Sequence, residues 1–490
     1  MMKESHSEEE SKLHETMSKI RHHLDSIITF LNPLLPLANC HMVEFFTHNH
    51  WDNLIPRNLK SSLDSLGLNE AVIKFWTLAE KDDTHDDSEL GKWIQKARSN
   101  CIAVNNEYCI SPEQFQVKIK SWGGEIKPEI KVKEFMNNKK SYEVQTMSRL
   151  VASLHQACAT SCCVEAGGGR GHLPVALSLG YGVPSLTIDC DEKSLTSGMG
   201  RVKIIQKQWH AIAKRVKDGC EEKVAKESNT NLHRFASAYV TRHTDLVTIV
   251  REKFPEMEQQ DVKLLLTGLH TCGNLGPDSL RIFRAQPATA AVFNVPCCYH
   301  LLTEETDSEL FDVFQKDYGF TQEGQGFPMS EHLKGYNLGR NARMLAAQSI
   351  DRVVSQRQLP AKSLLYRALL QVLIKRHLPD FPLSDGKLKR LSKYEDFQQY
   401  FKMADETLNL NLFDKLPDSY VSDFCKDMDS QWKDMVLFYL LRLCLAQVVE
   451  SVILLDRLLY LYESGFQNVY LVKLFDPVLS PRCHSIVAVR

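Results

Sequence analysis

Residues 162–173 read Cys-Cys-Val-Glu-Ala-Gly-Gly-Gly-Arg-Gly-His-Leu. The apolar start predicts a strand, the glycines predict a turn, and the residues from Leu173 onward predict a helix. Glycine permits positive φ in such a turn, and it lacks the Cβ atom that would keep a ligand away from the backbone. The stretch therefore predicts a strand–turn–helix unit whose turn binds a ligand.

The spacing of the glycines distinguishes between possible ligands. Gly167, Gly169 and Gly171 follow the order G-x-G-x-G, whereas a dinucleotide-binding turn follows G-x-G-x-x-G. With Glu165 two residues ahead, the turn resembles the S-adenosylmethionine site of class I methyltransferases. A glutamate there attracts the cationic methionine end of that cofactor and would repel a pyrophosphate.

Two further acids are candidates for cofactor binding. An acid about 20 residues beyond the turn is expected to accept hydrogen bonds from the ribose hydroxyls. Asp189, at the end of the apolar run 185–188, is assigned this role, with Asp191 as the second choice. Asp245 is predicted to accept a hydrogen bond from the adenine amino group, although a solvated turn explains residues 241–245 equally well.

Short apolar runs alternate with helical patterns from residue 162 onward, which predicts an α/β fold with a parallel sheet. The last two strands are joined by a short segment with two prolines and are expected to be antiparallel. The expectation is a Rossmann-like sheet of seven strands, the last one antiparallel. Its strands are predicted at residues 163–166, 185–188, 237–240, 262–267, 288–295, 469–475 and 484–489.

The chain has 490 residues, more than one hydrophobic core usually supports. Residues 1–135 show helical periodicity and are predicted to form an N-terminal helical accessory region. Residues 136–490 are predicted to form the α/β domain, with helical inserts at about 203–232 and 333–431. We expect these inserts to surround the acceptor site.

Composition excludes several classes of protein. Lysine plus arginine (59) nearly equals aspartate plus glutamate (61), so no general basic charge indicates nucleic-acid binding. Fourteen cysteines are too few for a disulfide scaffold of this length, and the charged start lacks the apolar run of a signal peptide. The apolar run 448–462 contains three charged residues, which favours a soluble helix over a membrane span. A cytoplasmic or nuclear protein is expected, without a membrane partner.

The substrate side is expected at the carboxyl ends of the fourth and fifth strands. The candidate catalytic residues there are His270, Asn294, Cys297, Cys298 and Tyr299. His270 is also a candidate for cofactor binding and, like His300, for a general base. The segment 294–299 loosely resembles the Asn-Pro-Pro-Tyr loop of amino-group methyltransferases, in which an amide and a carbonyl hold the nitrogen and an aromatic ring stacks on the base.

The cysteines near these strand ends allow four interpretations. In the first, the cysteines bind a metal together with Cys272 and the nearby histidines; in the second, one cysteine is a nucleophile. In the third, the loop forms a polar slot for an amine, and in the fourth the two thiols are buried and unreactive. Adjacent side chains usually diverge, and zinc sites commonly use C-x-x-C pairs, so Cys297 and Cys298 are poorly spaced for zinc. No metal is therefore expected.

Four segments together resemble the methyltransferase-like protein 25 family, whose relatives include ribosomal-RNA adenine dimethylase domain-containing proteins. They are residues 165–173, 268–273, 297–302 and 469–477, within a resemblance that spans about 139–490. It implies a class I methyltransferase fold and S-adenosyl-L-methionine as cofactor. The chain departs from the family pattern at Asn274, where aspartate is usual, and at residues 294–296, where a glycine-containing stretch is usual.

Two functions are carried forward from the sequence. The first is methyl transfer from S-adenosylmethionine to a nitrogen on RNA or protein. The second is a non-catalytic scaffold that keeps the fold and binds a partner, because a fold does not establish a reaction. Arg340 and Arg343 are expected either to bind substrate or to sit on a solvated helix.

Overall fold

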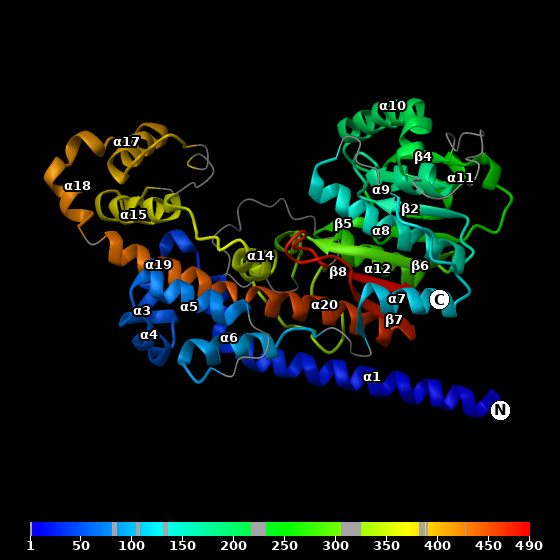
Figure 1. The fold of residues 1–490 in the computed structure, drawn as a ribbon, viewed down its shortest axis with the longest axis horizontal. Coiled ribbons are helices and arrows are strands. Elements are labelled where there is room, and N and C mark those ends of the chain that lie inside the picture. The colour runs from blue at the N-terminus through cyan, green and yellow to red at the C-terminus, as the bar shows by residue number, and fades with distance from the viewer. Residues whose placement is uncertain are drawn as a thin grey trace. The chain divides into compact units, whose positions relative to one another are not determined.

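The computed structural model describes residues 2–80, 86–103, 108–130, 136–216, 232–304, 325–381, 388, 391–426 and 428–490. These residues form two compact units, each built from separate parts of the chain (Figure 1). The first unit comprises Met1–Thr29, Asn100–Gln348 and Val449–Arg490. The second comprises Phe30–Ser99 and Ser349–Val448.

The first unit contains a sheet of eight strands in the order β1-β7-β8-β6-β5-β2-β3-β4. Strand β8 runs antiparallel to both of its neighbours, and the other pairs are parallel. The strands are β1 (Cys109–Ile110), β2 (Cys162–Ala166), β3 (Ser185–Asp189), β4 (His233–Ser237), β5 (Leu264–Cys272), β6 (Thr289–Cys297), β7 (Asn468–Lys473) and β8 (His484–Val489).

The α/β fold predicted from the sequence is confirmed, including the antiparallel last strand, with two differences. The third predicted strand, 237–240, lies too late, because β4 covers His233–Ser237. The strand begins with two polar residues, His233 and Arg234, so it does not read as an apolar run. Inside the sheet the polar ring of His233 has a partner, because its Nε2 atom lies 2.9 Å from the Thr187 hydroxyl. The two-residue strand β1 was not predicted, since only its distant partner β7 reveals it.

Strand β2 occupies the centre of the sheet, between β3 and β5 and parallel to both. All five of its residues are buried, as expected for a strand covered on both faces. Glu165 pairs in register with Thr187 on β3 and with Thr267 on β5. The carboxyl ends of β2, β3, β5 and β6 therefore meet at one edge of the sheet.

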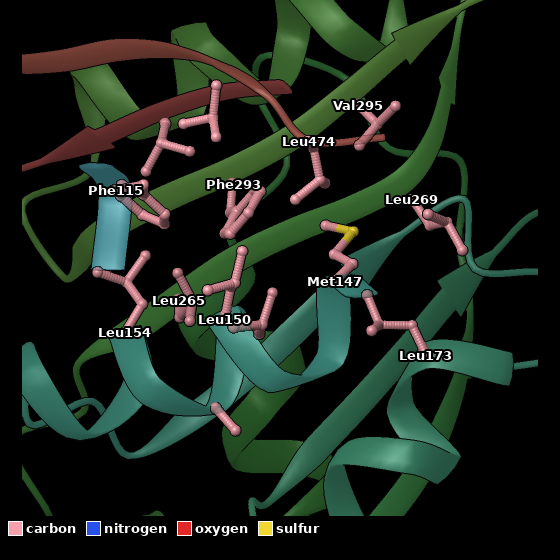
Figure 2. Packing of buried hydrophobic residues seen from close by; sticks show 14 of the residues in the cluster. Phe115, Met147, Leu150, Leu154, Leu173, Leu265, Leu269, Phe293, Val295 and Leu474 are labelled. Atoms are coloured by element: carbon pink, nitrogen blue, oxygen red, sulfur yellow. The ribbon is translucent and has the colours of Figure 1, made fainter. Parts of the chain in front are cut away.

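Helices α7 and α8 cover a face of the sheet that holds a cluster of buried hydrophobic residues. Met147, Leu150 and Leu154 of α8 point toward Leu265 of β5 and Phe293 of β6, as Figure 2 shows. The helices of this unit are α7 (Pro112–Ser121), α8 (Asn138–Ala157), α9 (His172–Val175), the π-helix η3 (Ala176–Gly180), α10 (Glu192–Val216), α11 (Leu246–Lys253), α12 (Leu275–Ala285), η6 (Tyr299–Leu301) and α13 (Arg340–Leu345).

The second unit is helical. Helix α14 contacts α5, and α19 contacts both α3 and α5, so the two chain segments share one core. Helices α1 (Met2–Leu31) and α20 (Ala446–Glu463) have residues in both units. The helices assigned to the second unit are α2 (Leu35–Asn39), α3 (His50–Leu54), α4 (Arg57–Asp64), α5 (Leu68–Glu80), α6 (Glu89–Ser99), α14 (Ile350–Ser355), α15 (Lys362–His377), α17 (Phe397–Leu408), α18 (Asp418–Phe424) and α19 (Met428–Leu443).

This grouping differs from the continuous regions 1–135 and 136–490 predicted from the sequence. Residues 30–99 of the predicted accessory region share a compact unit with 349–448, most of which was predicted as an insert of the α/β domain. Periodicity identifies helices but does not show which helices share a core. The predicted insert 203–232 lies on the second half of α10, and residues 217–231 are outside the described part of the chain.

Among the described residues, one helical stretch, Ser430–Glu463, is long and apolar enough by length and composition to cross a membrane. Its most apolar window is 89% buried inside the protein. A buried core helix meets the same criterion, so this stretch is weak evidence for a membrane span.

Candidate active site

The glycine turn follows β2 directly and has the backbone that the sequence predicts. Gly167, Gly169 and Gly171 have φ values of 68°, 53° and 64°, a region that residues with a Cβ atom rarely occupy. The N–H groups of Gly167 and Gly168 both donate to the carbonyl of Ile188 on β3, at 2.9 and 3.2 Å. The turn is therefore tied to the neighbouring strand.

The three alternate glycines have different surroundings. A Cβ atom on Gly167 would lie 2.6 Å from the Leu275 side chain, and one on Gly171 would lie 2.8 Å from Thr187 and His233. At Gly169 the nearest atom to such a Cβ is an oxygen of Asp189, 3.8 Å away. Gly167 and Gly171 thus serve internal packing, whereas Gly169 borders open space that a ligand can enter.

Glu165 is buried beneath this turn with one oxygen unsatisfied. Its side chain is 4% exposed, and its Oε2 atom has no hydrogen-bond partner among the described residues. A Cβ atom on Gly168 would collide with that oxygen, so the carboxylate lies against the turn. Desolvation raises the pKa of Glu165 to about 7, although the charge of Lys140 opposes the shift. A cationic group beside Oε2 would relieve the cost of burying this carboxylate.

Asp189 lies at the end of β3, next to the turn. Its Oδ2 accepts the N–H of Gly169 and its Oδ1 accepts the N–H of Asp191, both at 2.8 Å. A carboxylate offers about four acceptor positions, so each oxygen retains one for a ligand hydroxyl. The second choice, Asp191, is exposed and accepts hydrogen bonds from Lys193 and Ser194 at the start of α10.

Asp245 is exposed and caps helix α11. Its Oδ1 accepts the N–H groups of Val247 and Thr248, at 3.0 and 3.2 Å, and its Oδ2 accepts the Thr248 hydroxyl. The hydrogen bond from Thr248 holds the pKa of Asp245 below its usual value. These contacts are those of a helix N-cap, and adenine recognition by Asp245 stays a prediction.

His270 lies where the pairing of β5 with β6 is irregular. The register shifts between Gly268 and Thr271, and such irregularities re-aim side chains at strand ends. The Nε2 atom of His270 lies 3.2 Å from an Oε2 atom of Glu143 on α8. The other Glu143 oxygen accepts the Ser480 hydroxyl at 2.6 Å. Glu143 was not predicted as a site residue, because nothing near it in the sequence places it beside β5.

Opposing effects act on the buried carboxylate of Glu143. Desolvation favours its neutral form, but the hydrogen bonds with His270 and Ser480 and the charges of His270 and Lys139 outweigh that effect. The pKa of Glu143 therefore lies below its usual value. An ionised Glu143 can only accept, so the His270 Nε2 atom carries the proton of this hydrogen bond. The Nδ1 atom of His270 then has a lone pair and can accept a proton.

Asn294 on β6 is buried, with its side chain 2% exposed. Neither its Oδ1 nor its Nδ2 atom has a hydrogen-bond partner within the described part of the chain. Its Oδ1 lies 3.3 Å from where a Cβ atom on Gly268 would stand, which places the amide against the irregular part of β5. A buried amide without partners is costly, so this position suits a bound polar group or an ordered water.

Tyr299 does not have the position that the sequence analysis expected. Its ring is 1% exposed, its hydroxyl donates to Glu450 at 2.7 Å, and the Arg457 guanidinium lies 5.9 Å from the ring centre. An enclosed ring has no free face, so it cannot stack on a substrate base. Arg343 is also structural: it is buried, forms an ion pair with Glu304 at 3.1 Å and donates to the carbonyl of Tyr299.

Cys272, Cys297 and Cys298 form a cluster at the ends of β5 and β6. The Sγ atom of Cys272 lies 3.1 Å from that of Cys297 and 3.3 Å from that of Cys298. The expectation that adjacent cysteines diverge is wrong here, because β6 ends at Cys297 and Cys298 has a left-handed backbone with φ of 49°. Hydrogen bonds with Cys272 and Cys297 hold the pKa of Cys298 well below its usual value, against the effect of desolvation.

Comparisons with known proteins agree with this geometry. A family model described as a methyltransferase domain matches residues 139–305, which include the glycine turn, Asp189 and the cysteine cluster. Two curated relatives, named "Probable methyltransferase-like protein 25" in Mus musculus and in Homo sapiens, are each 27% identical to this chain. The alignments cover 95% and 96% of this chain, and 96% and 97% of the relatives. No solved structure matches the chain.

These findings confirm the resemblance to the methyltransferase-like protein 25 family predicted from the motifs. Together with the order of the strands, they also confirm the α/β class I methyltransferase fold. The matched domain ends before β7 and β8, which complete the sheet from the end of the chain.

Proposed function

We propose that the protein transfers a methyl group from S-adenosylmethionine to a nitrogen of an RNA or protein acceptor. The proposal is supported by the match of residues 139–305 to a methyltransferase domain and by the similarity of almost the whole chain to methyltransferase-like protein 25. The acceptor is proposed from the size of the helical additions to the sheet. We also propose that the protein acts in the cytoplasm or nucleus, without a membrane partner.

The observation that carries the cofactor proposal is the arrangement of charge and space around the turn. Glu165 has an unsatisfied buried oxygen, Gly169 borders open space, and Asp189 retains acceptor positions on both oxygens. These features fit the three parts of S-adenosylmethionine: a cationic methionine end, a sulfonium-linked chain that must approach the backbone, and a ribose with two hydroxyls. A dinucleotide would place its pyrophosphate close to Glu165, which charge repulsion disfavours.

S-adenosylmethionine, when bound, supplies a methyl group that is already activated by its positively charged sulfur. The residues of this chain then have to hold the acceptor in line with that group, and positioning supplies most of the acceleration. The unpartnered Asn294 amide is suited to hold an acceptor nitrogen. His270, held by Glu143, is suited to receive the proton that the nitrogen loses.

Calorimetric titration with S-adenosylmethionine and S-adenosylhomocysteine tests cofactor binding. We expect saturable binding by the wild type and none by Gly169→Arg, whose side chain fills the open space. Gly123→Arg is the matched control, because Gly123 also has a positive φ, of 85°, and no atom lies within 4 Å of its Cβ position, so this variant should bind as the wild type does. A wild type that binds neither compound would contradict the proposed cofactor.

Transfer of label from methyl-labelled S-adenosylmethionine to a cell extract tests the reaction. Digesting the labelled extract with nuclease or with protease then distinguishes an RNA acceptor from a protein acceptor. We expect label in one of these fractions with the wild type and none with Gly169→Arg. Cofactor binding without any transfer would favour a non-catalytic scaffold over an enzyme.

A further inference from the structure

Three thiols from two strands converge beyond the cofactor turn. Cys272 ends β5, Cys297 ends β6, and Cys298 follows it. All three Sγ atoms lie within 4.8 Å of one another. Cys297 is buried, Cys298 is half-buried and Cys272 is exposed, so an ion from solvent can reach the group.

The spacing of these sulfur atoms suits one small thiophilic cation. A Zn²⁺–sulfur bond is about 2.3 Å long, so two thiolates on a tetrahedral ion lie about 3.8 Å apart. The separations of 3.1 and 3.3 Å in this structure lie about 0.7 and 0.5 Å below that value. Small side-chain rotations can therefore admit an ion without moving either strand.

A candidate fourth donor, His300, follows Cys298 by two residues, and its ring nitrogens lie outside the group of ligand atoms within 4.8 Å of one another. His300 lies in η6, and its Nδ1 atom is buried without a hydrogen-bond partner among the described residues. An imidazole nitrogen that is withheld from water and unpaired is unfavourable, and metal coordination would satisfy it. The positive charge of Arg482 acts on Cys272 and Cys298 and would offset the negative charge of a three-thiolate site.

We propose that Cys272, Cys297 and Cys298 bind one Zn²⁺ ion, and that a rotation of the His300 side chain brings in its imidazole as the fourth ligand. A site with four protein ligands is closed and structural. It would fix the ends of β5 and β6, which carry His270 and Asn294, relative to each other. The proposal does not depend on methyl transfer, because the sulfur geometry alone carries it.

Zinc content and cobalt substitution test the proposal on the full-length protein, purified with reductant and without chelator. We expect about one Zn²⁺ per chain by mass spectrometry of the metal. Co²⁺ added to the metal-free protein should give the strong near-ultraviolet charge-transfer absorption of thiolate ligands. Because only sulfur ligands produce that band, it separates this site from Glu44, His48 and His50, the other group of three possible ligands among the described residues.

Four variants assign the ligands. Cys272→Ser and Cys298→Ser should weaken metal binding by more than about 100-fold, since loss of a ligand exceeds the 10–100-fold effect of losing an outer-shell partner. Cys190→Ser is the matched control, because Cys190 is exposed at the end of β3 and lies outside the cluster. His300→Gln should weaken binding and keep the thiolate band.

Several results would overturn the proposal. The first is a folded, reduced wild type that takes up neither Zn²⁺ nor Co²⁺. The second is a folded Cys272→Ser variant that binds Co²⁺ as tightly as the wild type. A Cys272–Cys297 disulfide in protein purified without reductant, with no metal uptake after reduction, would instead indicate a redox pair. Circular dichroism of each variant establishes that it is folded, and Cys298→Ser repeats the test should Cys272→Ser not fold.

Discussion

Glu165, proposed above to bind the cofactor, lowers the stability of the folded chain at high pH. Its pKa is raised by burial from the usual 4.5 to about 7, so the folded chain keeps a proton that the unfolded chain has released. The stability that this proton confers is complete below pH 4.5 and is lost as the pH rises through 7. At pH 8 the folded protein without cofactor therefore holds an uncompensated buried charge.

Glu165→Gln keeps the shape of the side chain and removes the charge. At pH 8 we expect the variant to be more stable than the wild type, by on the order of 1–3 kcal/mol in the free energy of unfolding. At pH 5 the difference should be smaller, because the wild-type carboxyl is then largely protonated. Urea unfolding at both pH values measures this.

Affinity for S-adenosylmethionine should change in the opposite direction. Loss of the charged partner should weaken binding about 10–100-fold, as expected for a hydrogen bond to a charged group. Glu258→Gln, at an exposed position, is the control and should change neither property. Equal stability of Glu165→Gln and the wild type at pH 8, or unchanged affinity, would contradict the role given to Glu165.

Residues whose position depends on local spacing could be placed from the sequence. The glycine turn, Glu165 and Asp189 lie where the predictions placed them, because their positions follow from one strand–turn–helix unit and the next strand. Tyr299 could not be placed in this way. Its burial depends on Glu450 and Arg457, which lie about 150 residues further along the chain, and no local pattern reports such contacts.

At the level of elements, the sequence predicted strands well where apolar runs coincide with them. Strand β8 has the predicted beginning and end, and β2 and β3 differ from prediction by one residue. Strand β4 was misplaced because its polar residues are satisfied by tertiary contacts, such as that between His233 and Thr187. The contact of helix α8 with the end of β5 through Glu143 was not predicted.

The contact between α8 and β5 leads to a prediction about catalysis. Glu143→Gln should lower kcat for label transfer about 10–100-fold, because a neutral amide no longer holds His270 by charge, and general-base catalysis contributes about 10²–10⁴-fold. The affinity for S-adenosylmethionine and the melting temperature should change little. Steady-state kinetics with labelled extract and calorimetry provide these measurements.

A control separates positioning by Glu143 from general packing of α8. Ser480→Ala removes the other hydrogen bond of Glu143 and leaves His270 in place, so its effect on kcat should be smaller. If Glu143→Gln lowered only the melting temperature, or raised KM for the cofactor without lowering kcat, Glu143 would be a structural residue.

At the scale of the whole molecule, the second unit depends on two segments that are far apart in the sequence. Phe438 is completely buried; its ring centre lies 5.2 Å from that of Phe45 and 5.9 Å from that of His50. Arg442 donates to the carbonyls of Leu37 and Ala38. Residues 30–99 therefore bury part of their apolar surface against 349–448, and periodicity alone could not reveal a unit built from two separate segments.

Phe438→Ala should consequently destabilise the second unit as a whole, by about 3–5 kcal/mol, as expected for loss of a buried phenylalanine. The residues of the proposed cofactor site all belong to the first unit, so the affinity for S-adenosylmethionine should stay within about twofold of the wild type. Scanning calorimetry with and without cofactor identifies the transitions, because the cofactor raises only the transition of the unit that binds it. Ile73→Ala, at a largely exposed position on α5, is the control. If Phe438→Ala abolished cofactor binding while the sheet remained folded, the second unit would be part of the binding site. The assignment of the cofactor site to the first unit alone would then be wrong.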